Sequence, residues 1–471
     1  MVSSEAPRDH DWPFSVVVGV LSLLPRLYVA IAWPREPVWD GHYYDFGARR
    51  IAAGLGYSDG TTVWHPWCHW PVGYSGLLAF IYKVFGSGLN TATVANACLG
   101  AALVVLVHRF ARYELGRWRA RVAALICAAS PGLIAYTALV MTEPLSALCL
   151  VLSGLIAARF AHDRPLLGAA LAGAVIGLGT LVHPATIAQA PLLVVIFLSD
   201  SSLRNARKAV AIGAIATACA LTVVAPWTLR NCRVMDRCAF VSTNGGWNLA
   251  IGSFARATGR FETLRSTDGC AIVTGQVQQD ACWRDLAIRT IAGDPIRWLA
   301  LVPKKLGYTF DQESFPIEYL HEADPDRWPE QRRERGRALL TATHRMLMIA
   351  SAFSMVALPS LSRSDLRDRG AISRLGLAIA MTALAAFVWL SDSTPFYLLA
   401  VALVVAAALP SRIGAAKGPV VAWAALSVLA TLVTHAVFFG EDRYHIVVTP
   451  MLSLLAAAAF RKGDRPAPAE S

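Results

Sequence analysis

The chain has 471 residues, of which 55% are hydrophobic and 16% are charged. Its mean hydropathy is +0.46. A soluble domain of this length could not bury so much apolar side chain, so the composition excludes that class and indicates a polytopic membrane protein. The formal net charge is +11, but the arginines cluster between apolar stretches. That bias is typical of cytoplasmic loops and does not indicate a nucleic-acid partner.

Apolar runs of about 17 to 25 residues are long enough to cross a bilayer as helices. The first run is too long for the core of a cleavable signal and lacks a small-residue cleavage pattern, so we expect it to be retained. The sequence predicts an all-α fold with about twelve spans, within a range of about 11 to 13. Their approximate limits are 14–33, 86–108, 120–138, 143–160, 165–183, 185–199, 209–228, 340–360, 372–391, 395–411, 418–438 and 445–460.

Lysine and arginine follow every second span, and the short intervening turns 139–142, 184 and 392–394 carry neither. This alternation predicts that both termini are cytoplasmic. It divides the chain into an N-terminal transmembrane catalytic module at 1–228 with its first outer loop at 34–85, an outer-face region at 229–339, and C-terminal helices with a short cytoplasmic tail at 340–471. The basic stretches are 109–121, 159–164, 204–208, 363–374, 412–417 and 461–465.

The first outer loop carries an acid beside a membrane span. After Asp40, apolar residues recur at the spacing of one helical face as far as Leu55, and Gly54 and Gly56 end the pattern. Asp40 is compatible with two readings, an N-cap of this short helix or a general base at the membrane surface. The stretch 71–85 is predicted to lie as an interfacial helix, because Pro71 and Lys83 fit poorly in a free-standing span.

A second acid opens the fourth predicted span in Thr142-Glu143-Pro144. The tripeptide suits a plain helix start, but Glu143 also falls on the same predicted face as Asp40, with no basic residue in its turn. Two acids facing one cavity suit glycosyl transfer, in which one deprotonates an acceptor hydroxyl and the other holds substrate or a cation.

Histidines and tryptophans gather before the interfacial helix. His65 and His69 flank Trp64, Trp67 and Trp70, which suit either an interfacial aromatic belt or stacking under a sugar or prenyl phosphate. These two histidines with Glu143 are weak candidates for a divalent metal site, for Mg²⁺ or Mn²⁺.

Two further residues at span ends are candidates for substrate contact. His183 precedes Pro184 at a predicted helix end. The sequence is compatible both with a role of His183 in helix packing and with a functional role. Arg443 precedes the last span and is a candidate for binding a lipid phosphate, with an interfacial anchor as the alternative. Arg49 and Arg50 in the first loop are further candidate cations.

Cysteine and glycine patterns give structural expectations. Four of the nine cysteines fall in 229–339, and in an oxidising compartment we expect the local disulfides Cys232–Cys238 and Cys270–Cys282, with free thiols as the alternative. Gly173 and Gly177 form a GxxxG pattern that predicts close helix packing. The sequence contains no Walker motif and no strand-linked GxGxxG, which argues against direct use of ATP or a dinucleotide.

Several blocks together resemble one known group of enzymes. They are the first-loop Asp40-Tyr43-Tyr44 set, PVGYSGLLAFIYKVFG at 71–86, SPGLIAYTALVMTEPLSAL at 130–148, STNGGWNLAIGSFARATGRF at 242–261 and FFGEDRYHIVVTPMLSLLAA at 438–457. In this order they resemble bacterial members of the GT-C glycosyltransferase superfamily, which includes protein O-mannosyltransferases, lipid A aminoarabinose transferases and RgtA-like transferases.

This resemblance implies an inverting transfer of a sugar from a polyprenyl-phosphate-linked donor to a hydroxyl acceptor on a glycolipid, polysaccharide or protein. It places the reaction on the periplasmic face of the bacterial inner membrane. It also implies that Asp40 is the catalytic base and Glu143 the second-loop acid. The expected substrate-binding residues are Tyr43, Tyr44, Arg49, His65, His69, His183, Asn244, Trp247, Asn248, Arg443 and Tyr444.

The chain departs from the family pattern at His183, where many relatives have an arginine before the proline. Two other functions remain compatible with the sequence. One is a lipid-linked sugar transporter or flippase, although we find no repeat between the two halves. The other is an O-antigen polymerase or ligase, which would use the arginines of 229–339.

Overall fold

The computed structural model describes residues 11–33, 35–60, 65–88, 90–198, 205–271, 273, 275–357, 369–411, 413–415 and 417–459. Within these ranges the chain is all-helical and has no strand, only two isolated bridges. Trp64 and the basic stretches 363–367 and 461–465, which entered the predictions, lie outside the described residues.

Seven helices in the described ranges are long and apolar enough to cross a membrane, or eight if one bent pair counts as a single span. The bent pair joins Gly116–Ala129 to Pro131–Ala138 at 49°. The protein is therefore a polytopic membrane protein, as the composition predicts. The seven helices are α1 (Trp12–Ala32), α4 (Thr91–Ala111), α7 (Glu143–Phe160), α8 (Pro165–Val182), α10 (Ala206–Val234), α17 (Arg369–Leu390) and α19 (Pro419–Val437).

Each of the twelve predicted spans coincides with a helical segment, and the count of twelve membrane crossings stays a prediction. The remaining predicted spans correspond to shorter or more polar helices, and the sixth is broken into three pieces because prolines interrupt it. These segments are α5 (Gly116–Ala129), α6 (Pro131–Ala135), η1 (Tyr136–Ala138), η2 (Pro184–Gln189), η3 (Pro191–Leu193), α9 (Val194–Phe197), α16 (Glu330–Phe353), α18 (Tyr397–Ala408), η7 (Tyr444–Val448) and α20 (Thr449–Ala458).

The GxxxG pattern lies where α8 packs against α10. A Cβ atom on Gly173 would lie 2.2 Å from the carbonyl oxygen of Ala216, and one on Gly177 would lie 2.6 Å from that of Ala220. Both distances are too short for a side chain, so the two glycines allow the helix backbones to touch. The predicted packing role of this pattern is confirmed.

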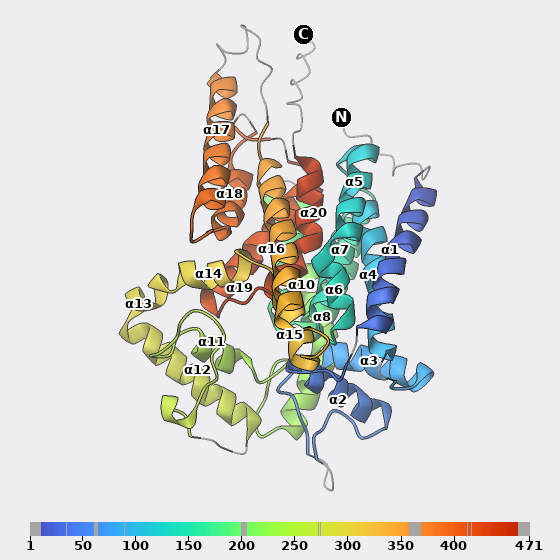
Figure 1. The fold of residues 1–471 in the computed structure, drawn as a ribbon, viewed down its shortest axis with the longest axis vertical. Helices are drawn as coiled ribbons and strands as arrows, with labels where there is room; N and C mark the ends of the chain where they lie inside the picture. The colour runs from blue at the N-terminus through green and yellow to red at the C-terminus, as the bar shows by residue number, and fades with distance from the viewer. Residues whose placement is uncertain are drawn as a thin grey trace.

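The two ends of the bundle differ in composition. At the end where α1 begins, Asp11 forms ion pairs with Arg117 and Arg121 of the basic stretch that opens α5. The short helices of the first loop, α2 (Asp40–Ala52) and α3 (Val72–Phe85), lie at the opposite end (Figure 1). Both helices were predicted, and α2 ends before Gly54 and Gly56, which adopt positive φ angles of 80° and 66°.

The region 229–339 folds as short helices at the same end as α2 (Figure 1). It has a core of its own, in which Phe254, Trp283 and Cys270 pack with Phe439 and Tyr444 from the C-terminal part of the chain. The predicted disulfides Cys232–Cys238 and Cys270–Cys282 are both present. Its helices are α11 (Gly245–Ile251), η5 (Ser266–Asp268), α12 (Gln276–Gly293), α13 (Pro295–Ala300), α14 (Val302–Phe310) and α15 (Phe315–Ala323).

Candidate active site

The backbone is strained immediately before Asp40. Trp39 adopts a φ of 51°, which costs a non-glycine residue of order 1–3 kcal/mol and is common at functional sites. Its ring packs against Phe315 and Tyr319 of α15, with centroids 5.5 and 5.8 Å away. The hydroxyl of Tyr319 also accepts a hydrogen bond from the backbone N–H of Val38. Helix α15 thus fixes the turn from which α2 starts.

Asp40 is the first residue of α2, and its carboxylate has two partners from distant parts of the chain. The indole Nε1 of Trp70 donates to Oδ1 at 3.0 Å, and Nη1 of Arg443 lies 2.6 Å from Oδ2. Burial raises the pKa of Asp40, but the charge of Arg443 and these hydrogen bonds outweigh burial and hold the pKa below its ordinary value. Asp40 is therefore ionised at neutral pH, with 31% of its side chain exposed.

Arg443 lies in the loop between α19 and η7 and connects two acids. Its Nε atom lies 2.6 Å from Oε2 of Glu441, on the other side of the guanidinium from Asp40. The guanidinium also lies over the rings of Phe315 and Tyr444, 5.3 and 5.0 Å from their centroids. Two ion pairs and two aromatic faces surround this cation, and 14% of its side chain is exposed.

Two cavities meet at this ion pair. The first, here called the Glu143 cavity, has a volume of about 570 Å³, and the second, the Arg260 cavity, has about 740 Å³. Asp40, Arg443 and Phe261 line both. The Glu143 cavity collects most of the predicted site: Asp40, Tyr44, His69, Glu143, His183, Asn244, Trp247, Asn248, Arg443 and Tyr444.

Glu143 begins α7 and borders the Glu143 cavity. Its residue is 2% exposed, and its Oε2 accepts a weak hydrogen bond of 3.4 Å from the hydroxyl of Thr142. No ion pair of Glu143 occurs among the described residues. Glu143 therefore places a carboxyl group on the cavity wall next to the Asp40 side.

His69 and His183 bring imidazole groups to the same cavity. The ring of His69 packs against Trp70 and Trp247, with centroids 4.4 and 5.8 Å away. Burial lowers the pKa of His69, so the ring is neutral at pH 7 and can both donate and accept a hydrogen bond. His183 follows the last residue of α8, where its ring lies 6.3 Å from that of Tyr444.

Three other predicted site residues lie elsewhere. Tyr43 lines the Arg260 cavity, where its ring stacks on Trp70. Arg49 pairs with Asp45 at 2.6 Å and lines neither cavity, because residues four apart on a helix share one side and Asp45 faces away from Asp40. His65 is exposed and pairs with Asp59, also away from both cavities.

The predicted metal ligands do not come together. His65 is outside the site, and Glu143 and His69 belong to no group of three ligand atoms among the described residues. The cation that the structure places beside Asp40 is the guanidinium of Arg443. We therefore assign no metal to Glu143, His65 and His69.

Sequence reasoning missed several residues of the site. Glu441 lies two positions before Arg443, in a block from which the sequence analysis selected only Arg443 and Tyr444 as site residues. His435 lies in the last turn of α19, stacks on Tyr444 with centroids 4.1 Å apart, and lines the Glu143 cavity. Phe261 and Arg260 come from the 242–261 block, whose family resemblance was the available signal.

One family model matches the segment that carries much of this site. Residues 69–229 match dolichyl-phosphate-mannose-protein mannosyltransferases, and this segment contains His69, Glu143 and His183. The matched segment covers about a third of the chain. Asp40 and Arg443 lie outside the match.

Solved structures of GT-C enzymes are similar to the chain at low identity. An oligosaccharyltransferase, AglB, from Archaeoglobus fulgidus in complex with an inhibitory peptide and a dolichol-phosphate is 14% identical, covers 94% of this chain and has a TM-score of 0.38. ArnT from Cupriavidus metallidurans bound to undecaprenyl phosphate is 16% identical, covers 95% and has a TM-score of 0.40. The chain spans 50% of the AglB chain and 77% of the ArnT chain. No curated protein sequence matches it.

Proposed function

We propose that the chain transfers a sugar, with inversion, from a polyprenyl-phosphate-linked donor to a hydroxyl acceptor on the outer face of the bacterial inner membrane. The observation that carries this proposal is the Asp40–Arg443 ion pair on the wall shared by two cavities. A transferase needs two substrates to meet at one base and one cation, and this wall provides both.

The Glu143 cavity suits the donor. It shares His183, Thr434 and His435 with a smaller pocket of about 40 Å³ that extends between α7, η2 and α19, past Leu150 and Val447. These helices belong to the apolar bundle, so the continuation offers a route for a prenyl chain toward the bilayer. A donor placed there would bring its phosphate to Arg443, which is the one lysine or arginine among the described residues that line this cavity.

The Arg260 cavity suits the acceptor. It lies on the other side of the Asp40–Arg443 pair and is lined by polar and charged side chains of α15 and α16, including Glu318, Arg333 and Arg337. Arg333 and Arg337 both pair with Glu318. Together with the aromatic rings of Trp39, Tyr43 and Tyr308, these side chains offer hydrogen-bonding groups and ring faces to a hydroxyl-rich acceptor.

The reaction at this wall follows from the two side chains. The Asp40 carboxylate takes the proton of the acceptor hydroxyl as its oxygen bonds to the anomeric carbon. The bond from that carbon to the phosphate oxygen breaks on the opposite face, and the phosphate leaves with the electron pair. Arg443 stabilises the added negative charge on the phosphate. Glu143 contributes an acid that orients sugar hydroxyl groups in the same cavity.

The ion pair gives Arg443 a second role. While Arg443 binds Asp40, it holds the pKa of that carboxyl group low and so makes it a weak base. A phosphate that draws the guanidinium toward itself loosens this pair and makes Asp40 more basic. The base is thus activated when the donor is bound.

The outer-face location has two supports. The acid-bearing loop lies at the end of the bundle opposite the basic stretch that pairs with Asp11 (Figure 1), and basic loops are typical of the cytoplasmic side. The region 229–339 at the acid-bearing end contains both disulfides, which are typical of an oxidising compartment.

Donor consumption by the purified full chain tests this function. Detergent-solubilised protein is incubated with undecaprenyl-phosphate sugars carrying radiolabelled mannose, glucose, galactose or a pentose, together with cell-envelope glycolipids. We expect one donor to release undecaprenyl phosphate while label enters the acceptor. Movement of intact donors across proteoliposomes, with no donor consumed, would contradict transfer and favour the transporter function.

A further inference from the structure

Three buried side chains from separate elements meet behind the Asp40–Arg443 wall. Glu313 lies in the loop between α14 and α15, His344 in α16, and His445 in η7. One ligand atom from each lies within 4.8 Å of the others. The side chains of both histidines are 0% exposed, and that of Glu313 is 5% exposed. None of the three lines the two cavities of the site.

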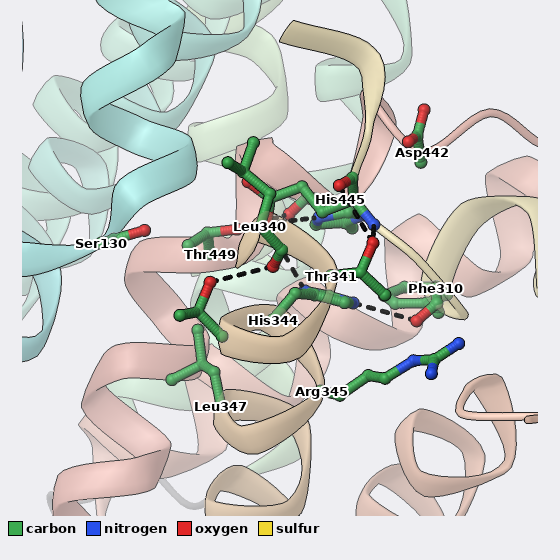
Figure 2. A network of polar contacts seen from close by, with 12 residues as sticks. Ser130, Phe310, Leu340, Thr341, His344, Arg345, Leu347, Asp442, His445 and Thr449 are labelled. Atoms are coloured by element: carbon green, nitrogen blue, oxygen red, sulfur yellow. Dashed lines mark hydrogen bonds and ion pairs between the residues drawn. The ribbon is translucent and has the colours of Figure 1, made fainter. Parts of the chain in front are cut away.

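Backbone carbonyls fix which nitrogen of each ring carries hydrogen. His344 Nε2 lies 2.9 Å from the carbonyl oxygen of Phe310, and His445 Nδ1 lies 2.7 Å from that of Thr309. Each of these nitrogens must donate, so in a neutral ring the other nitrogen keeps its lone pair. Figure 2 shows His344, His445 and the His344–Phe310 contact. The two imidazole rings are stacked, with centroids 3.9 Å apart.

The two remaining nitrogens face one carboxylate oxygen. His445 Nε2 lies 3.3 Å and His344 Nδ1 3.9 Å from Oε2 of Glu313. A single proton on Glu313 could serve only one of these nitrogens. The other nitrogen, His344 Nδ1, would then have no hydrogen-bond partner, and neither would Glu313 Oε1. Among the described residues, both atoms are buried and unpaired. Such a deficit is costly in a buried site.

We propose that Glu313, His344 and His445 bind a divalent metal ion of the zinc class. A cation in contact with both nitrogens and Oε2 uses all three lone pairs at once. Tetrahedral zinc with ligands at about 2.0–2.1 Å has neighbouring ligand atoms about 3.3 Å apart. The distance from His445 Nε2 to Oε2 matches this value, whereas His344 Nδ1 is 3.9 Å from Oε2, so the ring of His344 would turn out of its stack on His445 to bind the ion. Two imidazoles and one carboxylate favour zinc over magnesium or calcium, which prefer oxygen ligands.

The hydrogen bonds behind the histidines support this assignment. Histidines that bind metals almost always donate their other ring N–H to a carbonyl or carboxylate, which fixes the tautomer and the ring orientation. Both rings of this triad meet that requirement with adjacent carbonyls of α14. These contacts turn the second nitrogen of each ring toward Glu313.

The metal would fasten the segment that carries Arg443. His445 lies two residues after Arg443, and Glu313 precedes Ser314, whose hydroxyl donates to Asp442 at 2.7 Å. The ion would thus tie η7, after the arginine, to the α14–α15 loop and to α16, while Ser314 holds Asp442 before the arginine. Glu313, His344 and His445 are positioning residues in this arrangement, and none touches the proposed substrates.

Metal retention by the purified full chain tests the proposal independently of sugar transfer. Protein in detergent is stripped with a chelator, incubated with zinc chloride, desalted, and measured by elemental mass spectrometry and thermal unfolding. We expect about one zinc ion per chain and a higher melting temperature with zinc than with chelator. The absence of retained zinc in the wild-type protein would overturn the proposal.

Variants locate the ion. Glu313→Gln, His344→Gln and His445→Gln should each lose most of the retained zinc, and His344→Cys, which supplies another zinc ligand, should recover part of it. His108→Gln is the matched control, because His108 is a buried histidine near the carboxylate of Asp11 outside the triad. Full retention in the triad variants, or equal loss in the control, would contradict the assignment.

Discussion

Asp40 and Arg443 are 403 positions apart in the chain, and their side chains form an ion pair of 2.6 Å. The contact joins the loop after α1 to the loop before the last helical segment. It therefore closes the site from both ends of the sequence. Since both residues line both cavities, a change in either is expected to affect the donor and the acceptor side together.

Removal of Arg443 should weaken phosphate binding. We expect Arg443→Gln to bind undecaprenyl phosphate at least ~10-fold more weakly, because a charge-assisted hydrogen bond to phosphate contributes about 1.5–3 kcal/mol. Native mass spectrometry of the purified protein with this lipid measures the loss. Arg49→Gln is the control, since Arg49 pairs with Asp45 outside both cavities, and should bind as the wild type does. If Arg443→Gln bound the lipid as tightly as the wild type does, the phosphate would have to bind at another place in the protein.

The pH dependence of activity should change in the same variant. In the wild type the pKa of Asp40 is held low, so activity should persist as the pH falls toward about 5. In Arg443→Gln burial is no longer offset by the positive charge, and the pKa of Asp40 should rise. The residual activity of the variant should therefore fall more steeply between pH 7 and pH 5 than that of the wild type. Parallel pH profiles would show that Arg443 does not control Asp40.

The contact between α8 and α10 should not tolerate a side chain. Gly173→Val should lower the free energy of unfolding by about 1–3 kcal/mol, because the Cβ atom of the valine would meet the backbone of Ala216. Gly76→Ala is the control, since a Cβ there meets nothing within 4 Å. Thermal unfolding in detergent compares the two. A stable Gly173→Val protein would mean that the helices separate easily.

Membrane orientation can be read from single cysteines placed at opposite ends of the bundle. Arg265 is exposed in the 229–339 region, and Asp163 lies in the turn between α7 and α8 with 71% of its side chain exposed. Each is replaced by cysteine in a separate variant. In a background without the free cysteines, an impermeant maleimide should label the first in intact cells and the second only after permeabilisation. The reverse pattern would place the site on the cytoplasmic face.

Local patterns in the sequence predict much of the fold. The bounds of α7 match the predicted span 143–160, because the apolar run begins at Pro144 and ends before the basic turn that follows Phe160. Helix α2 begins at Asp40 and stops before two glycines for the same kind of reason. The sixth predicted span does not form one continuous helix. It consists of short 3₁₀ and α-helical pieces, because Pro184 and Pro191 interrupt it.

Partnerships between distant residues were harder to predict. Asp40 and Arg443 were each identified, but only the folded chain shows that they pair. Arg49 was expected to bind substrate, and its partner four residues earlier on the same helix explains why it points away. The Glu313–His344–His445 group has no local motif, since its members come from three elements that meet only in the fold.

The rate of sugar transfer by Asp40→Asn tests the central claim most directly. The substitution keeps the size of the side chain and removes the base, so label transfer from the undecaprenyl-phosphate donor should fall by about 10²–10⁴-fold. Asp45→Asn is the control on the same helix, because Asp45 pairs with Arg49 and lines neither cavity. It should keep most of the activity at equal protein level. Transfer by Asp40→Asn at the wild-type rate would contradict the account.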